Sequence, residues 1–239
     1  MNRTTPAFDR EKPQVVGSFG CLQDLLDCSI ATAQDACDWI EVRLDILLRD
    51  GWQLAEKPWS HLQALPILFT ARCASEGGVL PLTVAQRHDM LTAVIDDAAA
   101  IDIELAQHQE MSASIAQLHE RQIPWIASMH HFQQMPAISL CRNARMTAAK
   151  LGASVFKLAT ILPHADAMTE LEDFQQETTD IAVATMGMGP NAPASRVRCA
   201  LAGSVLNYGF IGQAPTAPGQ WPAAALRQAI QQRNIPPLA

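Results

Sequence analysis

The sequence is poor in charged and aromatic side chains, and it contains no long hydrophobic run. Charged residues make up 17% of the 239 residues and aromatic residues 5%, while 49% are hydrophobic. A chain of this size and composition can bury a sizeable core, so we expect a globular protein rather than a disordered one. No apolar run approaches the roughly 20 residues of a membrane span, so no transmembrane helix is predicted.

Three further features are absent from the sequence, and each excludes a class of function or a cellular location. The chain has no excess of positive charge, and its net charge of -7 argues against a nucleic-acid partner, which would select a basic face. The 6 cysteines form no C-x-x-C pair and no Cys/His cluster with zinc spacing, so no metal site is predicted. The first 13 residues lack the apolar segment of a signal peptide, so we expect a reduced, cytoplasmic protein with free thiols.

What the sequence does contain is an alternation of short apolar runs and helical segments. Strands are predicted at 15–19, 39–46, 67–71, 101–105, 125–129, 155–160, 181–186 and 206–211, and helices at 23–38, 109–121, 135–151, 165–178 and 223–233. Thr83 and Gln86 form a capping-box pattern at the start of another helix, and Gly152 stands where a helix should stop. Short apolar strands of this kind are typical of parallel sheets covered by helices.

Eight strands alternating with helices in a chain of this length predict an α/β protein with one (β/α)8 TIM barrel domain over 1–239. Residues 1–13 are expected to form an extension, and residues 234–239 a frayed tail. An open doubly wound sheet is the alternative, but no G-x-G-x-x-G motif follows the first strand. In a barrel the chemistry occurs at the carboxyl ends of the strands, and this rule sorts the candidate residues.

The first candidate is a lysine inside an apolar strand. Lys157 lies between Phe156 and Leu158, where an ammonium costs several kcal/mol unless it is paired or loses its proton. A lysine that is easily deprotonated is a nucleophile that can form an imine with a ketone. A strand-end lysine whose ammonium reaches water is the alternative, and this segment alone favours it.

Charged side chains also mark the ends of two other predicted strands. Glu41, Arg43 and Asp45 alternate with apolar residues and therefore share one face of a strand, which in a barrel can be the interior. A surface strand with a weak salt bridge explains the pattern equally well. Arg72 ends the next strand, and Glu76 follows in a loop whose two glycines allow a sharp turn close to a ligand.

A histidine, a serine–arginine pair and a loop rich in Pro and Gly complete the candidate site. His130 lies at the end of the fifth strand and can act as a general acid or base. Neighbours on a strand face opposite sides, so only one of His130 and His131 should reach the barrel mouth. Ser195 or Arg196, near a helix start, suits a carboxylate ligand, and the loop 212–220 suits a lid.

Seven short motifs follow one another along nearly the whole chain. They are Glu41-x-Arg43-x-Asp45, Thr70-x-Arg72-x-x-x-Glu76-Gly77-Gly78, Ser128-x-His130-x-Phe132, Lys157-x-Ala159, Ser195-Arg196, Gly203-Ser204 and Ala217-Pro218-Gly219-Gln220. In this order they resemble type I 3-dehydroquinate dehydratase, the class I, Schiff-base-forming family of the shikimate pathway. Each motif alone is weak, whereas the combination is specific.

The resemblance implies a (β/α)8 barrel, a homodimer, no metal and no cofactor. It implies that Lys157 forms a Schiff base with the C3 ketone of 3-dehydroquinate, and that 3-dehydroshikimate leaves after a syn elimination. It further implies that His130 takes the C2 proton and then protonates the leaving C1 hydroxyl, while Glu76 orients His130. The implied substrate-binding residues are Glu41, Arg43, Arg72, Arg196, Thr216, Gln220 and, by a looser match, Ser18. Apolar neighbours and the nearby cations Arg72 and Arg196 favour the neutral, nucleophilic amine.

Three positions depart from the family pattern. His131 stands where an acidic residue usually follows the catalytic histidine, and this neighbour is expected to lower the pKa of that histidine. Ala192 stands about where a glycine is usual, with prolines on both sides, so a stiffer loop is expected before Arg196. Thr216 replaces a serine of the lid but keeps the hydroxyl. Together these differences predict an active but slow enzyme.

Two other functions fit parts of the pattern. Another class I lysine-dependent barrel lyase, such as an aldolase, would often bind a phosphate, whereas Ser195-Arg196 and the lid motif favour a carboxylate. A non-catalytic binding barrel derived from the dehydratase would need no nucleophile. The joint presence of Lys157, His130 and Glu76 argues against that function.

Overall fold

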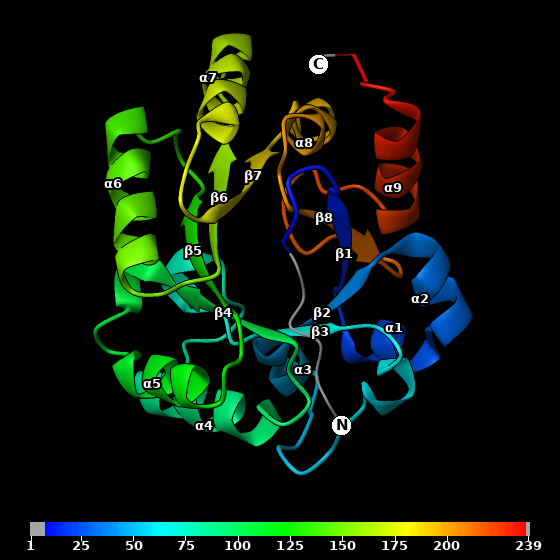
Figure 1. Cartoon of the computed structure of the whole chain (residues 1–239). Coiled ribbons are helices and arrows are strands. Elements are labelled where there is room, and N and C mark those ends of the chain that lie inside the picture. Colours follow the sequence, from blue (N-terminus) through cyan, green and yellow to red (C-terminus); the bar gives the residue numbers. More distant parts are fainter. Residues whose placement is uncertain (1–7, 238–239) are drawn as a thin grey trace.

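Eight parallel strands follow one another around a nearly closed barrel in the computed structural model, which describes residues 8–237 (Figure 1). The strands are β1 (Gln14–Phe19), β2 (Trp39–Arg43), β3 (Ile67–Thr70), β4 (Ala100–Glu104), β5 (Trp125–His131), β6 (Val155–Ile161), β7 (Ala182–Met188) and β8 (Leu206–Ile211). The gap in the ring lies between β7 and β8, where the amide of Val205 donates to the carbonyl of Val183 at 3.1 Å. The predicted (β/α)8 barrel is confirmed, and the doubly wound alternative is wrong.

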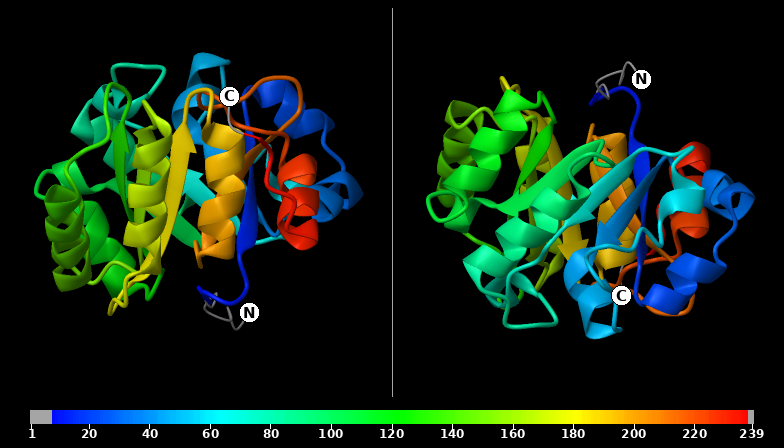
Figure 2. Two further views of the ribbon diagram at one scale, coloured as in Figure 1. Left: turned by 90° about the horizontal axis from the view of Figure 1, so that it is seen from above. Right: turned by 90° about the horizontal axis from the view of Figure 1, so that it is seen from below.

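Helices cover the outside of the barrel, as both views in Figure 2 show. They are α1 (Leu22–Asp27), α2 (Ile30–Ala36), α3 (Leu44–Arg49), α4 (Val84–Val94), α5 (Ser112–Glu120), α6 (Ile138–Lys150), α7 (Ala165–Gln176), α8 (Ala192–Leu201) and α9 (Ala223–Gln232), with short 3-10 turns at Ser60–Leu62, Ala74–Glu76 and Leu105–Gln107. The main core lies between these helices and the strands and includes the buried rings of Trp52, Trp59 and Phe156. None of the helices within residues 8–237 is long and apolar enough to cross a membrane.

A second apolar cluster lies inside the barrel. Val16, Trp39, Leu68 and Ile126 fill its amino-terminal end, and other members of the cluster reach the carboxyl ends of the strands. The ring of Phe8 stacks on Trp39 with 5.8 Å between ring centroids, so the segment before β1 covers this end of the barrel. The expected extension and tail include residues 1–7 and 238–239, which lie outside the described residues.

Two local predictions are confirmed in atomic detail. Thr83 and Gln86 form a reciprocal capping box, in which each side chain accepts a hydrogen bond from the backbone amide of the other residue at 3.2 and 2.9 Å. Gly152 follows α6 with φ +75°, a left-handed conformation that glycine adopts without steric cost. Apart from the segment 39–46, the predicted strand ends agree with the structure within two residues.

Two predicted elements are wrong, and in each a short helix begins inside the predicted span. The predicted helix 23–38 is two short helices, since the hydroxyl of Ser29 accepts from the amide of Thr32 at 3.1 Å and caps α2. The predicted strand 39–46 ends at Arg43. There α3 begins, with Asp45 in its first turn, so Asp45 does not continue the strand face of Glu41 and Arg43.

Candidate active site

A cavity at the carboxyl ends of the strands brings together nearly all of the predicted site residues. Its lining consists of Glu41, Arg43, Arg72, Glu76, Gly77, His130, Phe132, Lys157, Ala159, Met186, Met188, Arg196, Tyr208, Thr216, Ala217 and Gln220. Of the ten residues predicted from the sequence, Ser18 alone is outside this lining, and its hydroxyl donates to the carboxylate of Glu41. Segments far apart in the chain therefore converge on one polar cavity.

Lys157 lies inside the barrel and does not reach water. Only 3% of the residue is exposed, so the alternative of an ammonium at the surface is wrong. Its Nζ donates to Oδ2 of Asp102 at 3.0 Å and lies 4.0 Å from the ring centroid of Tyr208. The carboxylate and the aromatic face hold the amine in one place and compensate part of the cost of burying it.

Asp102 is a functional residue that the sequence reasoning missed. Its other oxygen, Oδ1, lies 2.9 Å from Nη1 of Arg72 and accepts from the hydroxyl of Ser128 at 2.6 Å. Burial alone would raise the pKa of Asp102, but Arg72 and Lys157 outweigh burial and hold this pKa well below its usual range. Asp102 is therefore a permanent carboxylate beside the amine. The signal was present in the alternating Ile101-Asp102-Ile103-Glu104 of a predicted strand.

A second buried acid holds Arg72 from the other side. Oε1 of Glu104 accepts from Nη1 of Arg72 at 2.9 Å and from the amide of Cys73 at 3.0 Å. Its Oε2 pairs with Arg87, a buried residue of α4 that also donates to the carbonyl of Ala71 at 2.7 Å. The guanidinium of Arg72 is thereby fixed at the cavity wall. Neither Glu104 nor Arg87 was predicted from the sequence.

His130 and Glu76 form a hydrogen-bonded pair at the cavity. Oε2 of Glu76 lies 2.8 Å from Nδ1 of His130 and accepts from the His130 amide at 2.9 Å. With a proton on Nδ1, the other ring nitrogen is left as an acceptor. Burial, together with the cations Arg72 and Lys157, lowers the pKa of His130 well below its ordinary value, and burial raises the pKa of Glu76 to about 7. The imidazole is therefore neutral near pH 7 and able to take a proton.

The two glycines after Glu76 place its carboxylate. Gly77 has φ +89°, and a Cβ at Gly78 would lie 2.4 Å from the carbonyl oxygen of Arg72. The loop therefore folds back tightly over the end of β3, as the glycine pair predicts. Phe132 packs on this turn, because a Cβ at Gly77 would lie 2.7 Å from its ring.

The lowered pKa of His130 agrees in direction with the sequence prediction, but the cause is different. Burial and the two cations account for it, whereas His131 is partly exposed and does not line the cavity. Adjacent strand residues face opposite sides, which separates His131 from the site.

Glu41, Arg43 and Asp45 are all buried, so the surface-strand alternative is wrong, but only Arg43 and Asp45 pair with each other. Glu41 accepts from the hydroxyls of Ser18 and Thr70, the latter at 2.9 Å. Arg43 donates to both oxygens of Asp45, at 2.9 and 2.7 Å. Asp45 does not line the cavity and instead holds Arg43, which does.

Arg196 is a buried cation with no acidic partner within residues 8–237. It is 2% exposed and lies in the first half of α8. Its Nη1 donates to the carbonyl of Tyr208 at 2.7 Å, but Nε has no partner among the described residues. Burial lowers the pKa of Arg196 to about 10. A guanidinium in this state lacks an anion, and a ligand carboxylate entering the cavity can supply one.

Ser195 has a structural place instead. Its hydroxyl donates to the carbonyl of Ala192 at 2.9 Å and accepts from the amide of Gly187 at 3.1 Å, which ties α8 to β7. Of the two candidates for an anion, only Arg196 lines the cavity.

The loop after β8 lies against the cavity and docks on the loop after β7. Oε1 of Gln220 accepts from the amide and the hydroxyl of Thr216 at 2.7 and 2.9 Å. A Cβ at Gly219 would lie 2.3 Å from the carbonyl oxygen of Gly189 and 2.7 Å from the methyl group of Ala192. The two loops therefore pack directly against each other, and Ala192 forms part of that contact.

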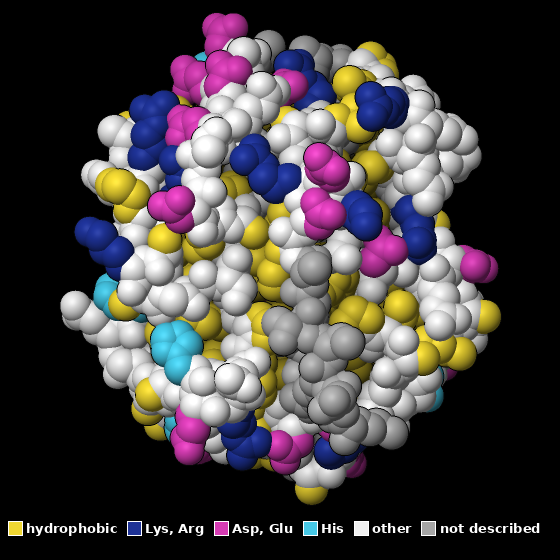
Figure 3. Space-filling model, in the orientation of Figure 1, with side chains coloured by type: hydrophobic (Ala, Val, Ile, Leu, Met, Phe, Trp, Pro, Cys, Tyr) yellow, Lys and Arg dark blue, Asp and Glu magenta, His cyan; other side chains and the backbone are white. Residues whose placement is uncertain are grey.

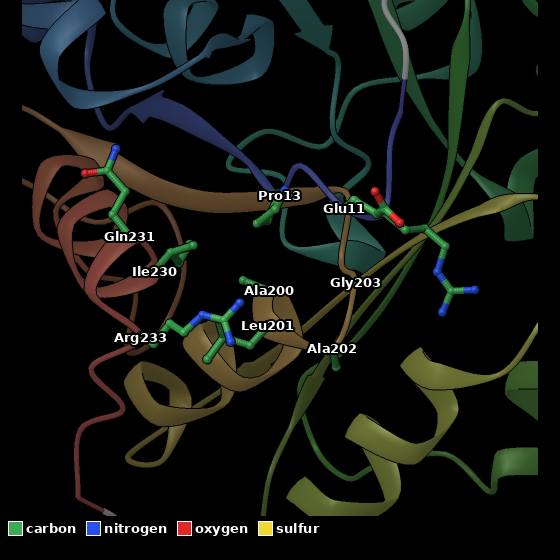
Figure 4. Close-up of a pocket in the computed structure, with 10 residues that line it drawn as sticks. Glu11, Pro13, Ala200, Leu201, Ala202, Gly203, Ile230, Gln231 and Arg233 are labelled. Carbon is green, nitrogen blue, oxygen red and sulfur yellow. The ribbon is translucent and has the colours of Figure 1, made fainter.

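A larger hollow lies at the opposite end of the barrel, between α8, α9 and the segment before β1 (Figure 4). Its volume is about 660 Å³, against about 80 Å³ for the cavity around Lys157. Figure 4 shows the side chain of Arg233 reaching toward the end of α8 at Leu201. Among the described residues its lining holds no histidine or lysine, so the larger hollow lacks the candidate base and nucleophile of the smaller cavity.

Comparison with known proteins identifies the family. The family model described as Type I 3-dehydroquinase matches residues 21–237. The chain belongs to this family. Membership makes the protein an enzyme of the hydro-lyase class. Among its relatives are the 3-dehydroquinate dehydratases of Salmonella typhimurium, Shouchella clausii and Methanosarcina barkeri, with 32%, 30% and 30% identity. The matches cover 69%, 91% and 94% of this chain and 68%, 88% and 96% of the relatives.

Solved structures of the type I 3-dehydroquinase family share the fold. The 3-dehydroquinate dehydratase of Geobacillus kaustophilus has a TM-score of 0.81 at 23% identity, covering 92% of this chain and 91% of that one. A type I enzyme of Clostridium difficile with covalently modified comenic acid has a TM-score of 0.78 at 20% identity, covering 93% and 92%. The carboxyl transferase domain of Rhizobium etli pyruvate carboxylase also matches, with a TM-score of 0.64 at 12% identity over 96% of this chain and 50% of that one. The barrel itself is therefore not specific to the family.

Proposed function

We propose that this enzyme dehydrates 3-dehydroquinate to 3-dehydroshikimate through a Schiff base on Lys157, by syn elimination. This reaction is the third step of the shikimate pathway, which leads to the aromatic amino acids. One observation carries the proposal: a buried amine, a neutral imidazole and a guanidinium without an acidic partner line the same cavity. A nucleophile, a base and an anion site are what a lysine-dependent dehydration of a keto acid requires.

The covalent step begins at Nζ of Lys157. The amine adds to the C3 carbonyl, and the adduct takes up one proton and loses water to leave an iminium, which acidifies the protons on C2. Asp102 lies 3.0 Å from Nζ and is held ionised, so it orients the amine and stabilises the positive charge of the iminium.

The proton transfers belong to His130. Its free ring nitrogen takes the C2 proton, while the hydrogen bond from Nδ1 to Glu76 fixes the tautomer and the ring orientation. The imidazolium then returns the proton to the C1 hydroxyl, which leaves as water. Hydrolysis of the iminium releases the product and restores the amine of Lys157.

The remaining groups bind the substrate. Arg196 pairs with the carboxylate, and this ion pair supplies the acidic partner that the buried guanidinium lacks. Thr216 and Gln220 close over the ligand from the loop after β8. Glu41, Arg43 and Arg72 hold the ring hydroxyls, and Ser18 acts through its hydrogen bond to Glu41.

A spectroscopic assay combined with trapping of the imine tests this proposal. The protein is mixed with 3-dehydroquinate, and the ultraviolet band of the conjugated enone is followed. In parallel, borohydride is added and the adduct is located by mass spectrometry. We expect the band, and an adduct on Lys157. The Lys157→Ala variant should lose both, whereas Lys150→Ala, at an exposed lysine of α6, should keep both.

The other outcomes separate the competing functions. An adduct on Lys157 without the enone band would favour another lysine-dependent lyase, such as an aldolase. Neither band nor adduct with folded protein would favour a binding barrel. Trapping that persists in Lys157→Ala would overturn the assignment of the nucleophile.

The proposal also includes the setting in which the reaction occurs. We infer that the chain acts as a single barrel domain, in the cytoplasm and as a homodimer. Sedimentation of the purified protein tests the dimer, and a monomer at assay concentration would contradict it.

A further inference from the structure

Tyr208 is the only tyrosine of the chain, and it lies in the wall of the candidate site. It belongs to β8, and 3% of the residue is exposed. The mechanism proposed above assigns no role to its hydroxyl. The family motifs found in the sequence do not include this position either.

The hydroxyl of Tyr208 is buried and has no hydrogen-bond partner among the described residues. A buried polar group without a partner is costly, and native proteins contain few of them. Two carboxylates, Glu41 and Asp102, lie near enough to affect Tyr208, and burial together with these acids raises the pKa of the phenol well above its ordinary value. The phenol therefore keeps its proton and can donate.

Neither of those acids accepts this proton, since the hydroxyl has no partner among the described residues, and both acids bind other donors. Glu41 accepts from the hydroxyls of Ser18 and Thr70. Asp102 accepts from Ser128 and Lys157 and pairs with Arg72. Tyr208 lines the cavity, so a molecule that enters it can supply the acceptor that the hydroxyl lacks.

We propose that the hydroxyl of Tyr208 donates a hydrogen bond to an oxygen atom of the bound ring acid, which makes Tyr208 a substrate-binding residue. The inference deepens the proposed function and rests on it. The ligand class follows from the neighbours: Lys157 overlies the same ring, so the atoms bonded to Nζ lie beside the phenol. A polyhydroxylated ring bound there presents oxygen acceptors at this distance.

The ring and the hydroxyl of Tyr208 have separable effects. The ring lies against Nζ of Lys157 at 4.0 Å and positions the amine. Tyr208→Phe keeps this contact and removes only the donor. Tyr208→Leu removes both. The pair of variants therefore distinguishes binding by the hydroxyl from positioning by the ring.

Steady-state kinetics and thermal unfolding of these variants test the inference. For Tyr208→Phe we expect KM to rise about 3- to 10-fold with little change in kcat. This pattern is expected because the lost hydrogen bond is made in both the ground state and the transition state. We expect the Tm of this variant without ligand to equal or exceed that of the wild type, because the substitution removes a buried donor that has no partner. Tyr208→Leu should lower kcat as well.

Thr185→Val is the matched control. It also removes a buried hydroxyl from a barrel strand, but that hydroxyl donates to Gln175 at 2.9 Å and does not line the cavity. Its Tm should fall and its KM should stay unchanged, the reverse of Tyr208→Phe. If the wild-type enzyme turns over 3-dehydroquinate and KM is unchanged in Tyr208→Phe, the inference about Tyr208 is wrong and the proposed function stands. A wild-type enzyme without turnover overturns the proposed function instead.

Discussion

The two halves of the barrel interior differ in what fills them, although the same strands supply both. Along β4 the buried residues Ala100, Asp102 and Glu104 share one face, and along β2 Trp39 and Glu41 do so. The first of each series is apolar and the later ones are charged. Along β2 and β4 the amino half is therefore packed like an ordinary core, whereas the carboxyl half supplies charges around the cavity. Stability and chemistry are divided along the length of these two strands.

The face of the molecule in Figure 3 does not share this division. On it, acidic and basic side chains lie interspersed rather than gathered into a patch of one sign. In the interior of β2 and β4 the separation is ordered, and there an unpaired charge is costly.

The largest expected effect is a loss of stability when a side chain in the apolar half of the barrel interior is truncated. Leu68 is fully buried in the amino-terminal cluster. Leu68→Ala should lower the free energy of unfolding by about 2–5 kcal/mol through lost transfer energy and a cavity. Chemical denaturation measures this loss, and kcat of the folded variant should remain at the wild-type value. A large fall in kcat would show that the two halves are not independent.

A smaller effect is expected in the charged half, where a substitution should weaken substrate binding without lowering stability. Arg196→Met removes a buried cation that has no acidic partner, so the Tm without ligand should not fall. KM should rise about 10- to 100-fold, the loss of a hydrogen bond to a charged group. Arg198→Met on the same helix removes only a partly exposed pair with Glu172, and both values should change little. A reduced Tm with an unchanged KM would make Arg196 a structural residue.

The smallest effect concerns pH. Folding raises the pKa of Glu76 from 4.5 to about 7. Between these two pH values the Glu76 carboxyl is protonated in the folded protein and ionised in the unfolded chain. This contribution to stability is complete below pH 4.5 and disappears as pH rises through about 7. Glu76→Gln removes this dependence on pH, because the amide does not titrate. The free energy of unfolding of the variant minus that of the wild type should therefore increase by about 1–3 kcal/mol from acid to neutral pH.

Denaturation curves at several pH values measure that difference. The lowered pKa of His130 acts in the opposite direction, losing stability as pH falls, but it is present in both proteins and largely cancels. Glu110→Gln, at an exposed position, is the control. Parallel curves for Glu76→Gln and wild type would contradict the raised pKa.

Local patterns in the sequence were sufficient for the architecture and for most of the cavity lining. Short apolar runs located the strands because period and length are local properties. Lys157 stood out because one charge interrupted such a run. The helix at α3 was missed, since Leu44, Ile46 and Leu47 are buried there and the alternation of charges before them imitates a strand.

The partners of the charges could not be predicted in the same way. Asp102 and Lys157 are 55 residues apart, and their contact depends on how the barrel closes. Apolar neighbours and cations near Lys157 are visible in the sequence, whereas this acid is not recognisable as its partner. The free donor of Tyr208 was equally invisible, because whether a hydroxyl has a partner is a property of the folded surroundings.

The pairing of Lys157 with Asp102 has a consequence for the cost of moving charge. In the proposed reaction the iminium places a positive charge on Nζ of Lys157, 3.0 Å from the carboxylate of Asp102. Asp102 is fixed by Arg72 and Ser128 and held ionised, so the counter-ion is already in place before this charge forms. It needs no reorientation when the intermediate appears, which is the condition under which a preorganised site acts most strongly.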